Sequence, residues 1–396
     1  MVPMTLELGP ALEQAKQYQQ ALLSDLQTIV NIDSGTYHKA GVDQVAQWMK
    51  GRLEASEYAV TVQPQSDFGN HLYGARSGKG KARILVIGHM DTVFPQGEPE
   101  RRPFTIKDGR ALGPGVLDMK SGLLLGVYAL DLLRKVKAEN YASITFLCNS
   151  DEEIGSPSSR SLVRELAAQA DVALVLEPGR ELDEVVIARK GVGNYRLEVR
   201  GVAAHAGVEP QKGRSAILEL AHKIVALQAL NGTIPGVTVN VGVVGGGARP
   251  NIVPDHAHAL IDVRAADKPG IAAVEEAFQR IARQVTIPDT ESAITGKLAH
   301  LPFEATPGNM ALFHLAKAEA ARQNIALRGI FTGGGSDGNT TATMIPTLDA
   351  LGLAGGMAHN PGEFILIDSI APRMVLLAGL IERIGAAFLD GGLATA

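Results

Sequence analysis

Histidine and acidic residues occur directly after short apolar runs in the first half of the chain. The runs span residues 84–87, 144–147 and 172–176. The residues that follow them are His89, Asp91, Asp151, Glu152, Glu153 and Glu177. Because ligands bind at the carboxyl ends of the strands in an open α/β sheet, we expect these side chains to converge at one edge of a sheet.

Two further candidates lie in glycine-rich segments. Asp118 belongs to the segment Gly-Pro-Gly-Val-Leu-Asp-Met-Lys at 113–120, and His359 belongs to Gly-Gly-Met-Ala-His-Asn at 355–360. Glycine permits backbone conformations that bring a neighbouring side chain close to a ligand. The chain therefore offers two histidines and several carboxylates, without thiolates, to a single site.

This set of nitrogen and oxygen donors suits Zn²⁺ and, less selectively, Co²⁺ or Mn²⁺. A single ion would leave some of the donors unused. Two ions about 3.5 to 4 Å apart would use the whole set, share one carboxylate and hold a water molecule between them as the nucleophile. We expect Asp118 to be the shared carboxylate.

Helix capping is the alternative interpretation of the acidic residues. Asp and Glu often accept backbone N–H groups where a helix begins, which would explain Asp151 or Glu153 singly. Capping does not explain the two histidines. Moreover, closely packed carboxylates without a cation repel one another and lose hydration, which raises their pKa values. A metal site is therefore the favoured interpretation.

Adjacent acids suggest a division of labour in the same site. In an extended segment the side chains of Glu152 and Glu153 point in opposite directions. One of them can then ligate a metal, while the other moves a proton from water to the leaving amine. Asp91 lies just beyond His89 and is expected to accept the second N–H of that imidazole, which fixes its tautomer.

The spacing of apolar residues predicts the elements that position these side chains. Up to residue 188, short apolar runs alternate with helical patterns, which is typical of an α/β domain with a mostly parallel sheet. Between 189 and 301 the predicted order is strand, helix, strand, strand, helix, strand, as in a ferredoxin-like α+β unit. The α/β pattern resumes over 302–396. We therefore predict a catalytic domain, 1–188 and 302–396, with an inserted domain at 189–301.

Composition excludes several function classes. The chain has 396 residues, of which 45% are hydrophobic and 20% charged, and its formal net charge is −5. This charge and the lack of a basic run argue against nucleic acid as a partner. No apolar run approaches the ~20 residues that span a bilayer, and the start lacks a signal-peptide pattern, so we expect no membrane partner and a cytoplasmic location. The single Cys148 is expected to be a buried thiol in a reducing compartment rather than a nucleophile.

Taken together, the motifs resemble a known family of co-catalytic zinc exopeptidases and deacylases. The motifs that carry the resemblance are His89-Met90-Asp91-Thr92-Val93, Gly-Val-Leu-Asp-Met-Lys-Ser-Gly at 115–122, Asp151-Glu152-Glu153-Ile154-Gly155, Glu177-Pro178, His205-Ala206-Gly207 and His359. The family includes glutamate carboxypeptidase, acetylornithine deacetylase, succinyl-diaminopimelate desuccinylase and aminoacylase. The chain is most similar to the glutamate carboxypeptidase branch, whose pattern also matches Thr-Gly-Gly-Gly-Ser-Asp at 332–337.

The resemblance implies a ligand set for two zinc ions, for which Co²⁺ or Mn²⁺ would substitute. It places one ion on His89 and Glu177 and the second on Glu153 and His359. Asp118 would bridge them.

The resemblance also implies the remaining roles. Glu152 matches the general base, and Asp91 matches the residue that orients His89. The inserted domain is expected to form a homodimer. His205 and Asn251 are expected to stabilise the oxyanion or bind substrate, in the same or a neighbouring subunit.

A substrate carboxylate is expected to meet the inserted domain and a glycine loop. Arg264 matches a family position that binds this group, and Arg suits bidentate capture of a carboxylate, although a surface ion pair is the plainer interpretation. Backbone N–H groups of Thr332, Gly333 and Gly334 are suited to the same carboxylate, because a phosphate cradle would need a following Lys.

Other histidines have plainer interpretations. A histidine after a strand, such as His205, is often a hydrogen-bonded turn residue. His256 and His258 lie two apart on one strand, where a solvated strand edge is favoured over another metal site.

The expected reaction is hydrolysis of the amide or peptide bond of an N-acyl or peptidyl amino acid, next to a free C-terminal carboxylate. Glutamate carboxypeptidases carry an Arg before a Pro-Phe pair, whereas this chain has His300-Leu301-Pro302-Phe303. A glutamate side chain would therefore need another partner, for which Arg249 is a candidate. The alternatives are a deacylase of the acetylornithine or desuccinylase kind and a metal-binding homologue without turnover.

Overall fold

The computed structural model describes residues 6–393. Contacts within the chain divide it into two compact units. Among the described residues, the first comprises 6–188, Ala305–Phe331 and 336–393, and the second comprises Arg189–Glu304 and Thr332–Gly335. The second unit thus continues to Glu304, whereas the sequence boundary falls at 301, because Phe303 still pairs with Arg189 through two backbone hydrogen bonds of 2.8 and 3.0 Å.

The first unit is built on a six-stranded sheet. In spatial order its strands are β1 (Ala59–Gln63), β2 (His71–Ser77), β6 (Tyr141–Asn149), β3 (Ala82–His89), β7 (Val172–Val175) and β16 (Thr347–Leu348). β3 pairs in parallel with β6 and β7, and β7 pairs in parallel with β16. β1 and β2 add an antiparallel edge. The predicted α/β class with a mostly parallel sheet is confirmed.

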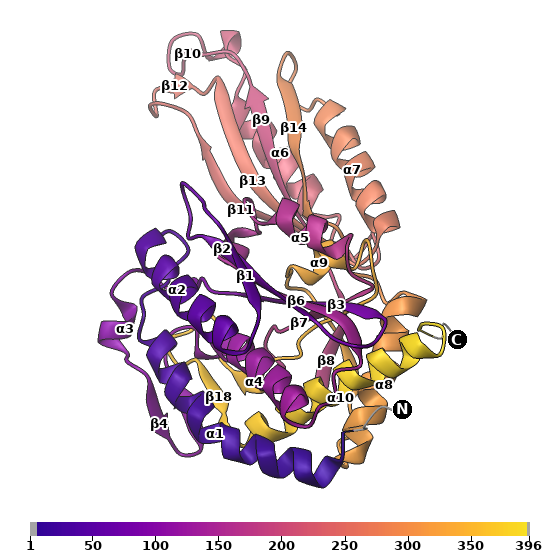
Figure 1. The fold of residues 1–396 in the computed structure, drawn as a ribbon. Helices are drawn as coiled ribbons and strands as arrows, with labels where there is room; N and C mark the ends of the chain where they lie inside the picture. Colours follow the sequence, from indigo (N-terminus) through magenta and orange to yellow (C-terminus); the bar gives the residue numbers. More distant parts are fainter. Residues whose placement is uncertain (1–5, 394–396) are drawn as a thin grey trace. The chain divides into compact units, whose positions relative to one another are not determined.

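Helices cover both faces of this sheet. The helices of the unit are α1 (Leu8–Val30), α2 (Lys39–Ala55), α3 (Glu98–Arg101), α4 (Ser121–Lys135), α5 (Arg160–Ala167), α8 (Pro307–Arg322), α9 (Gly338–Thr341) and α10 (Ile370–Leu389). Helices α1, α4 and α10 pack against one another (Figure 1). On β3, Ile84 and Val86 belong to the core that these helices share. Leu85 and Ile87 point to the other face, where α5 packs. This is why the run 84–87 is apolar throughout rather than alternating.

Smaller strands complete the first unit. Four of them form a sheet in the order β17 (Gly355–Gly356), β18 (Phe364–Leu366), β5 (Arg110–Leu112) and β4 (Thr105–Lys107). β8 (Glu184–Arg189) pairs with β15 (Arg328–Thr332). The sequence prediction contains no counterpart of α2, β1 or β2. β1 is an edge strand with mostly exposed residues, so it lacks the apolar alternation that marks a strand.

The second unit has the expected ferredoxin-like order of elements. Along the chain these are β9 (Gly191–Arg200), α6 (Ala216–Gln228), β11 (Thr238–Gly246), β13 (His256–Ala265), α7 (Lys268–Arg283) and β14 (Glu291–His300). The strands form one antiparallel sheet in the order β11-β13-β9-β14. Alternate residues of β9, Tyr195, Leu197 and Val199, join a core with the two helices. A short ribbon pairs β10 (Ala204–His205) with β12 (Ile252–Val253).

Helix starts in both units carry local sequence signals. Ser215 accepts the Leu218 N–H before α6, and Thr306 accepts the Asn309 N–H before α8. Asp267 does the same for Gly270 before α7. Such capping side chains satisfy backbone donors that have no partner within the helix. Among residues 6–393, no helix combines the length and apolar character needed to cross a membrane.

Candidate metal centre

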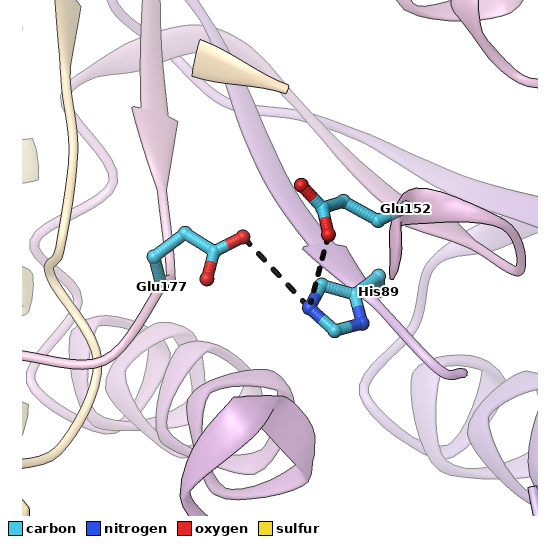
Figure 2. A group of neighbouring side chains, drawn as sticks. All are labelled: His89, Glu152 and Glu177. Atoms are coloured by element: carbon cyan, nitrogen blue, oxygen red, sulfur yellow. Dashed lines mark ion pairs between the residues drawn. The ribbon is translucent and has the colours of Figure 1, made fainter. Parts of the chain in front are cut away.

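His89 is held at the carboxyl end of β3 with one ring nitrogen facing a group of carboxylates. Its side chain is buried, and Nε2 lies 3.2 Å from Asp118 Oδ1, 3.8 Å from Glu177 Oε1 and 3.9 Å from Glu152 Oε2. Figure 2 shows Glu152 and Glu177 directed at the same ring nitrogen. The opposite nitrogen, Nδ1, lies 3.0 Å from the backbone oxygen of Asp91 and 3.4 Å from its Oδ1. These contacts leave Nε2 as the nitrogen directed at the carboxylates.

Asp118 lies between two imidazoles. Its Oδ1 faces His89, and its Oδ2 lies 3.0 Å from Nε2 of His359. The same nitrogen of His359 lies 3.2 Å from Oε2 of Glu153. One carboxylate thus presents a separate oxygen to each histidine, which is the arrangement a bridging ligand requires.

Donor atoms gather in two overlapping groups within the described part of the chain. One group is His89, Glu152 and Glu177, and the other is His89, Asp118 and Glu153, with donor atoms within 4.8 Å of one another in each. Glu153 Oε1 is buried and has no hydrogen-bond partner among residues 6–393. An orphaned carboxylate oxygen beside imidazoles and further carboxylates fits a divalent cation, so the residues present suit a two-metal site.

The Asp118 loop is held by a residue that sequence reasoning missed. Glu363 is fully buried, and its Oε1 accepts the backbone N–H groups of Leu117 and Asp118, each at 2.8 Å. Its Oε2 accepts the Gly115 N–H at 3.0 Å. Gly115 has φ 71° and a Cβ there would lie 2.4 Å from Thr92 Cγ2, so both conformation and space require glycine. Proximity to His359 in the sequence was the only available signal for Glu363.

Asp91 connects His89 to the loop that carries the adjacent acids. Its Oδ1 accepts the Glu152 N–H and its Oδ2 accepts the Glu153 N–H, both at 3.2 Å. This loop is a 3₁₀ turn, Glu152–Ile154, rather than the extended segment that the sequence suggested. The turn still directs the two side chains differently, because successive residues are rotated around its axis. Glu152 faces His89, and Glu153 faces His359.

Asp151 does not join the cluster. Its carboxylate accepts the backbone N–H groups and the hydroxyls of Ser158 and Ser159, at 2.5 to 3.3 Å. These serines directly precede α5. Asp151 therefore orders the segment before α5, although neither α5 nor the turn that begins after Asp151 has a side-chain cap.

Burial and mutual interaction shift the pKa values in the cluster. Burial raises the pKa of Glu152 and Glu153, and the charge of Glu177 adds to the shift at Glu152. For His89, burial works in the opposite direction, yet hydrogen bonds with Asp118 and Asp91 raise its pKa well above 6.5. Hydrogen bonds with Asp118 and Glu153 raise the pKa of His359 to about 10. Without a cation, protons supply the positive charge that the carboxylates favour.

The remaining candidates lie in the second unit. His205 is exposed at the end of β10, where the Ala206 N–H donates to the backbone oxygen of Asn251 at 3.0 Å. Arg264, on β13, pairs with Asp262 at 2.9 Å. Thr332 is buried, its backbone oxygen accepts the Lys190 N–H, and Gly334 accepts Arg189 Nη1 at 3.2 Å. Gly333 has open space around its Cα.

Two further side chains near the cluster, Asp337 and Thr36, have no role in the sequence prediction. Asp337 ends the segment 332–337, and its carboxylate accepts Asn149 Nδ2 and Ser156 Oγ, each at 2.6 Å. Thr36 Oγ1 donates to Asp91 Oδ2 at 2.7 Å. Both side chains stabilise loops around the cluster through these hydrogen bonds. His256, by contrast, is an exposed residue of the inner strand β13 and pairs with Glu198 at 2.6 Å.

Comparisons with known proteins agree with this geometry. The model of peptidase family M20/M25/M40 matches residues 85–383. Carboxypeptidase G2 from Pseudomonas sp. (strain RS-16) is 29% identical over 379 residues, which cover 94% of this chain and 91% of that protein. Succinyl-diaminopimelate desuccinylase from Bordetella pertussis is 30% identical over 331 residues, covering 78% of this chain and 85% of that protein.

A solved structure extends the agreement to the fold. The crystal structure of an aminopeptidase from Bacillus cereus matches with a TM-score of 0.77 and 25% identity, covering 92% of this chain and 98% of that one. Because the family model matches more than half of the residues, the chain belongs to peptidase family M20/M25/M40, a family of metal-dependent hydrolases.

Proposed function

We propose that the chain hydrolyses the amide or peptide bond that joins an acyl or peptidyl group to an amino acid with a free carboxylate. The observation that carries the proposal is Asp118, whose two oxygens face His89 and His359 separately. Carboxypeptidase G2 and the desuccinylase are named for removing a terminal residue and an acyl group, respectively. Both reactions are hydrolysis of an amide bond, which supports this substrate class.

Five residues would hold two Zn²⁺ ions, with Co²⁺ or Mn²⁺ as substitutes. His89 and Glu177 are assigned to one ion, Glu153 and His359 to the other, and Asp118 to both. When bound, the ions would polarise the scissile carbonyl and increase the acidity of a water molecule. The nitrogen and oxygen donors and the absence of thiolates among the clustered residues support this choice of metal.

Glu152 is assigned the proton transfers. It accepts a proton from the attacking water as the water oxygen bonds to the carbonyl carbon. It then donates that proton to the amide nitrogen while the C–N bond breaks, which yields a carboxylic acid and a free amine. Its position supports this role, because its carboxylate faces His89 while the neighbouring Glu153 faces His359. Asp91 keeps His89 in the required tautomer.

The second unit is assigned to the substrate carboxylate. Arg264 and the backbone N–H groups of Thr332, Gly333 and Gly334 would bind it, and His205 and Asn251 would stabilise the oxyanion or bind substrate. Glutamate as the released residue is the finer proposal, with Arg249 as the partner of its side chain. The inserted domain would also form a homodimer.

A substrate panel tests the proposal. Metal-loaded protein is assayed with N-acyl-glutamates, dipeptides, N-acetylornithine and N-succinyl-diaminopimelate. Where it can be made, the C-terminal amide of each substrate is assayed for comparison. We expect cleavage of free carboxylates and at least about a hundredfold lower kcat/KM for the amides, because a charged hydrogen-bonding group is lost. Preference for N-acetylornithine or the succinyl substrate would favour a biosynthetic deacylase. Cleavage of none would favour a binding protein without turnover.

Metal content provides an independent test of the site. Elemental analysis of protein purified without chelators should give about two transition-metal ions per chain. A ratio near zero or one would contradict the shared role of Asp118.

A further inference from the structure

A cavity opens beside the candidate metal centre within the first unit. Its volume is about 470 Å³, and its walls come from residues 35–38, 92–96 and 153–154. Glu153, whose side chain faces His359, forms part of the wall. Small-molecule sites have volumes of about 300 to 1,000 Å³, so this cavity is large enough for an organic group of a substrate.

The cavity walls are mainly apolar. Tyr37, Val93, Phe94, Pro95 and Ile154 contribute to them. Tyr37 is 78% exposed and Val93 is 41% exposed. Large apolar side chains that share an exposed surface are usually covered by a ligand or a partner. The lining residues include no Lys or Arg, and the one imidazole, His38, has its Nδ1 3.1 Å from the backbone oxygen of Asp33. The cavity therefore suits an uncharged apolar group, and its lining contains no Lys or Arg that would pair with an acidic one.

Hydrogen bonds hold the walls to the metal-site loops. The Thr36 N–H donates to the Thr92 oxygen at 3.1 Å, and the Thr92 N–H donates to the Ser34 oxygen at 2.9 Å. Thr36 Oγ1 also donates to Asp91, the same carboxylate that accepts the Glu153 N–H. A Cβ on Gly35 would lie 2.4 Å from the Phe94 oxygen, so the two wall segments are closely packed. The cavity is thus preformed and fixed relative to Glu153.

We propose that this cavity binds an apolar, preferably aromatic, acyl group on the carbonyl side of the scissile bond. The inference rests on the proposed function, in which residues of the second unit bind the free carboxylate on the amine side. The cavity consists of first-unit residues alone and adjoins Glu153, so the acyl half of the substrate is the part left to fill it. A succinyl group is disfavoured, because its second carboxylate would lose hydration among apolar side chains, with no Lys or Arg in the lining to pair with it.

Matched substrates that share one C-terminal residue test this assignment. N-benzoyl, N-acetyl and N-succinyl derivatives are compared by kcat/KM with the metal-loaded protein. We expect the benzoyl substrate to exceed the acetyl substrate by at least about tenfold, because burial of an aromatic ring is favourable. The succinyl substrate should be the poorest of the three. A preference for succinyl over benzoyl would overturn the inference.

Two variants locate the selectivity in the cavity. Val93→Trp fills the space, and Tyr37→Ala removes an exposed wall side chain with little risk to folding. Both should lower the benzoyl-to-acetyl ratio several-fold, whereas Ile106→Trp, at a 55% exposed position on β4, should leave the ratio unchanged. An unchanged ratio in both cavity variants would overturn this inference but not the proposed function. If the wild type hydrolyses none of the three substrates, the proposed function fails as well.

Discussion

The backbone N–H of Asp118 donates to Glu363, a residue 245 positions later in the chain, at 2.8 Å. This contact attaches the loop that carries Asp118 to the segment that carries His359. Burial raises the pKa of Glu363 to about 7, while its hydrogen bonds with the backbone of Asp118, Leu117 and Gly115 oppose the shift. The loop geometry therefore depends on a carboxylate that is not itself directed at the site.

Replacement of Glu363 should weaken metal binding. In Glu363→Gln, the amide NH2 group replaces an oxygen that accepts one or two of the three backbone N–H groups, so the Asp118 loop loses part of its support. We expect the metal affinity to fall about 10- to 100-fold, the usual effect of changing a group that orients a ligand. Competition with a chromophoric chelator measures it. Glu165→Gln, on the exposed side of α5, is the matched control, and an affinity equal to that control would refute the role of Glu363.

Replacement of Glu152 should separate catalysis from metal binding. Glu152→Gln keeps the shape of the side chain but cannot accept a proton. We expect kcat to fall at least about a hundredfold while the metal content stays near that of the wild type. Steady-state kinetics and elemental analysis on the same sample provide both values. Undiminished kcat would assign the proton transfers to another residue.

Metal binding should release protons at neutral pH. The pKa values of His89 and His359 are both raised, to about 10 for His359, because neighbouring carboxylates favour the imidazolium form. A metal ion requires the neutral imidazole. Affinity should therefore rise with pH until the folded-state pKa values are passed, and fall on acidification. Calorimetric titration in buffers with different ionisation enthalpies counts the released protons. A binding heat that is independent of the buffer would contradict this expectation.

Cys148 should be unreactive in the folded protein. Its side chain is fully buried on β6, and burial raises the pKa of the thiol well above its usual range. Because the thiolate is the reactive form, both effects suppress modification. A thiol reagent at pH 8 should label the chain only after addition of denaturant, with one thiol counted per chain. Rapid labelling of native protein, or loss of activity on alkylation, would reopen Cys148 as a functional group.

Self-association should depend on the second unit. Large apolar side chains are exposed on α6 and on the edge strand β11; these are Ile217, Leu218, Val225, Val243 and Val244. A second copy would cover them in the proposed homodimer. Val225→Asp places a charge at a 72% exposed position and should shift the mass measured by light scattering from dimer to monomer. Val62→Asp, in the first unit, should not. If the wild-type protein is monomeric at all concentrations tested, the homodimer proposal is wrong.

Local patterns along the chain are enough to predict most of the elements and the kinds of side chain that gather at the site. The apolar run 84–87 followed by His89 predicted a strand that ends at a ligand, and the period of 189–301 predicted the ferredoxin-like order. Such patterns are readable because burial on a strand or helix depends on the nearest residues along the chain. Edge elements such as β1, which are mostly exposed, left no comparable pattern.

The mutual support of residues that are distant in the sequence is visible only after folding. In the folded chain Glu363 binds the Asp118 loop, Asp151 binds Ser158 and Ser159, and a cavity adjoins Glu153. Glu152 and Glu153 face different histidines. None of these relations has a signature in local spacing. They arise from packing and from hydrogen bonds between segments that the chain separates by tens to hundreds of residues, and the lowest free energy of the whole arrangement selects them.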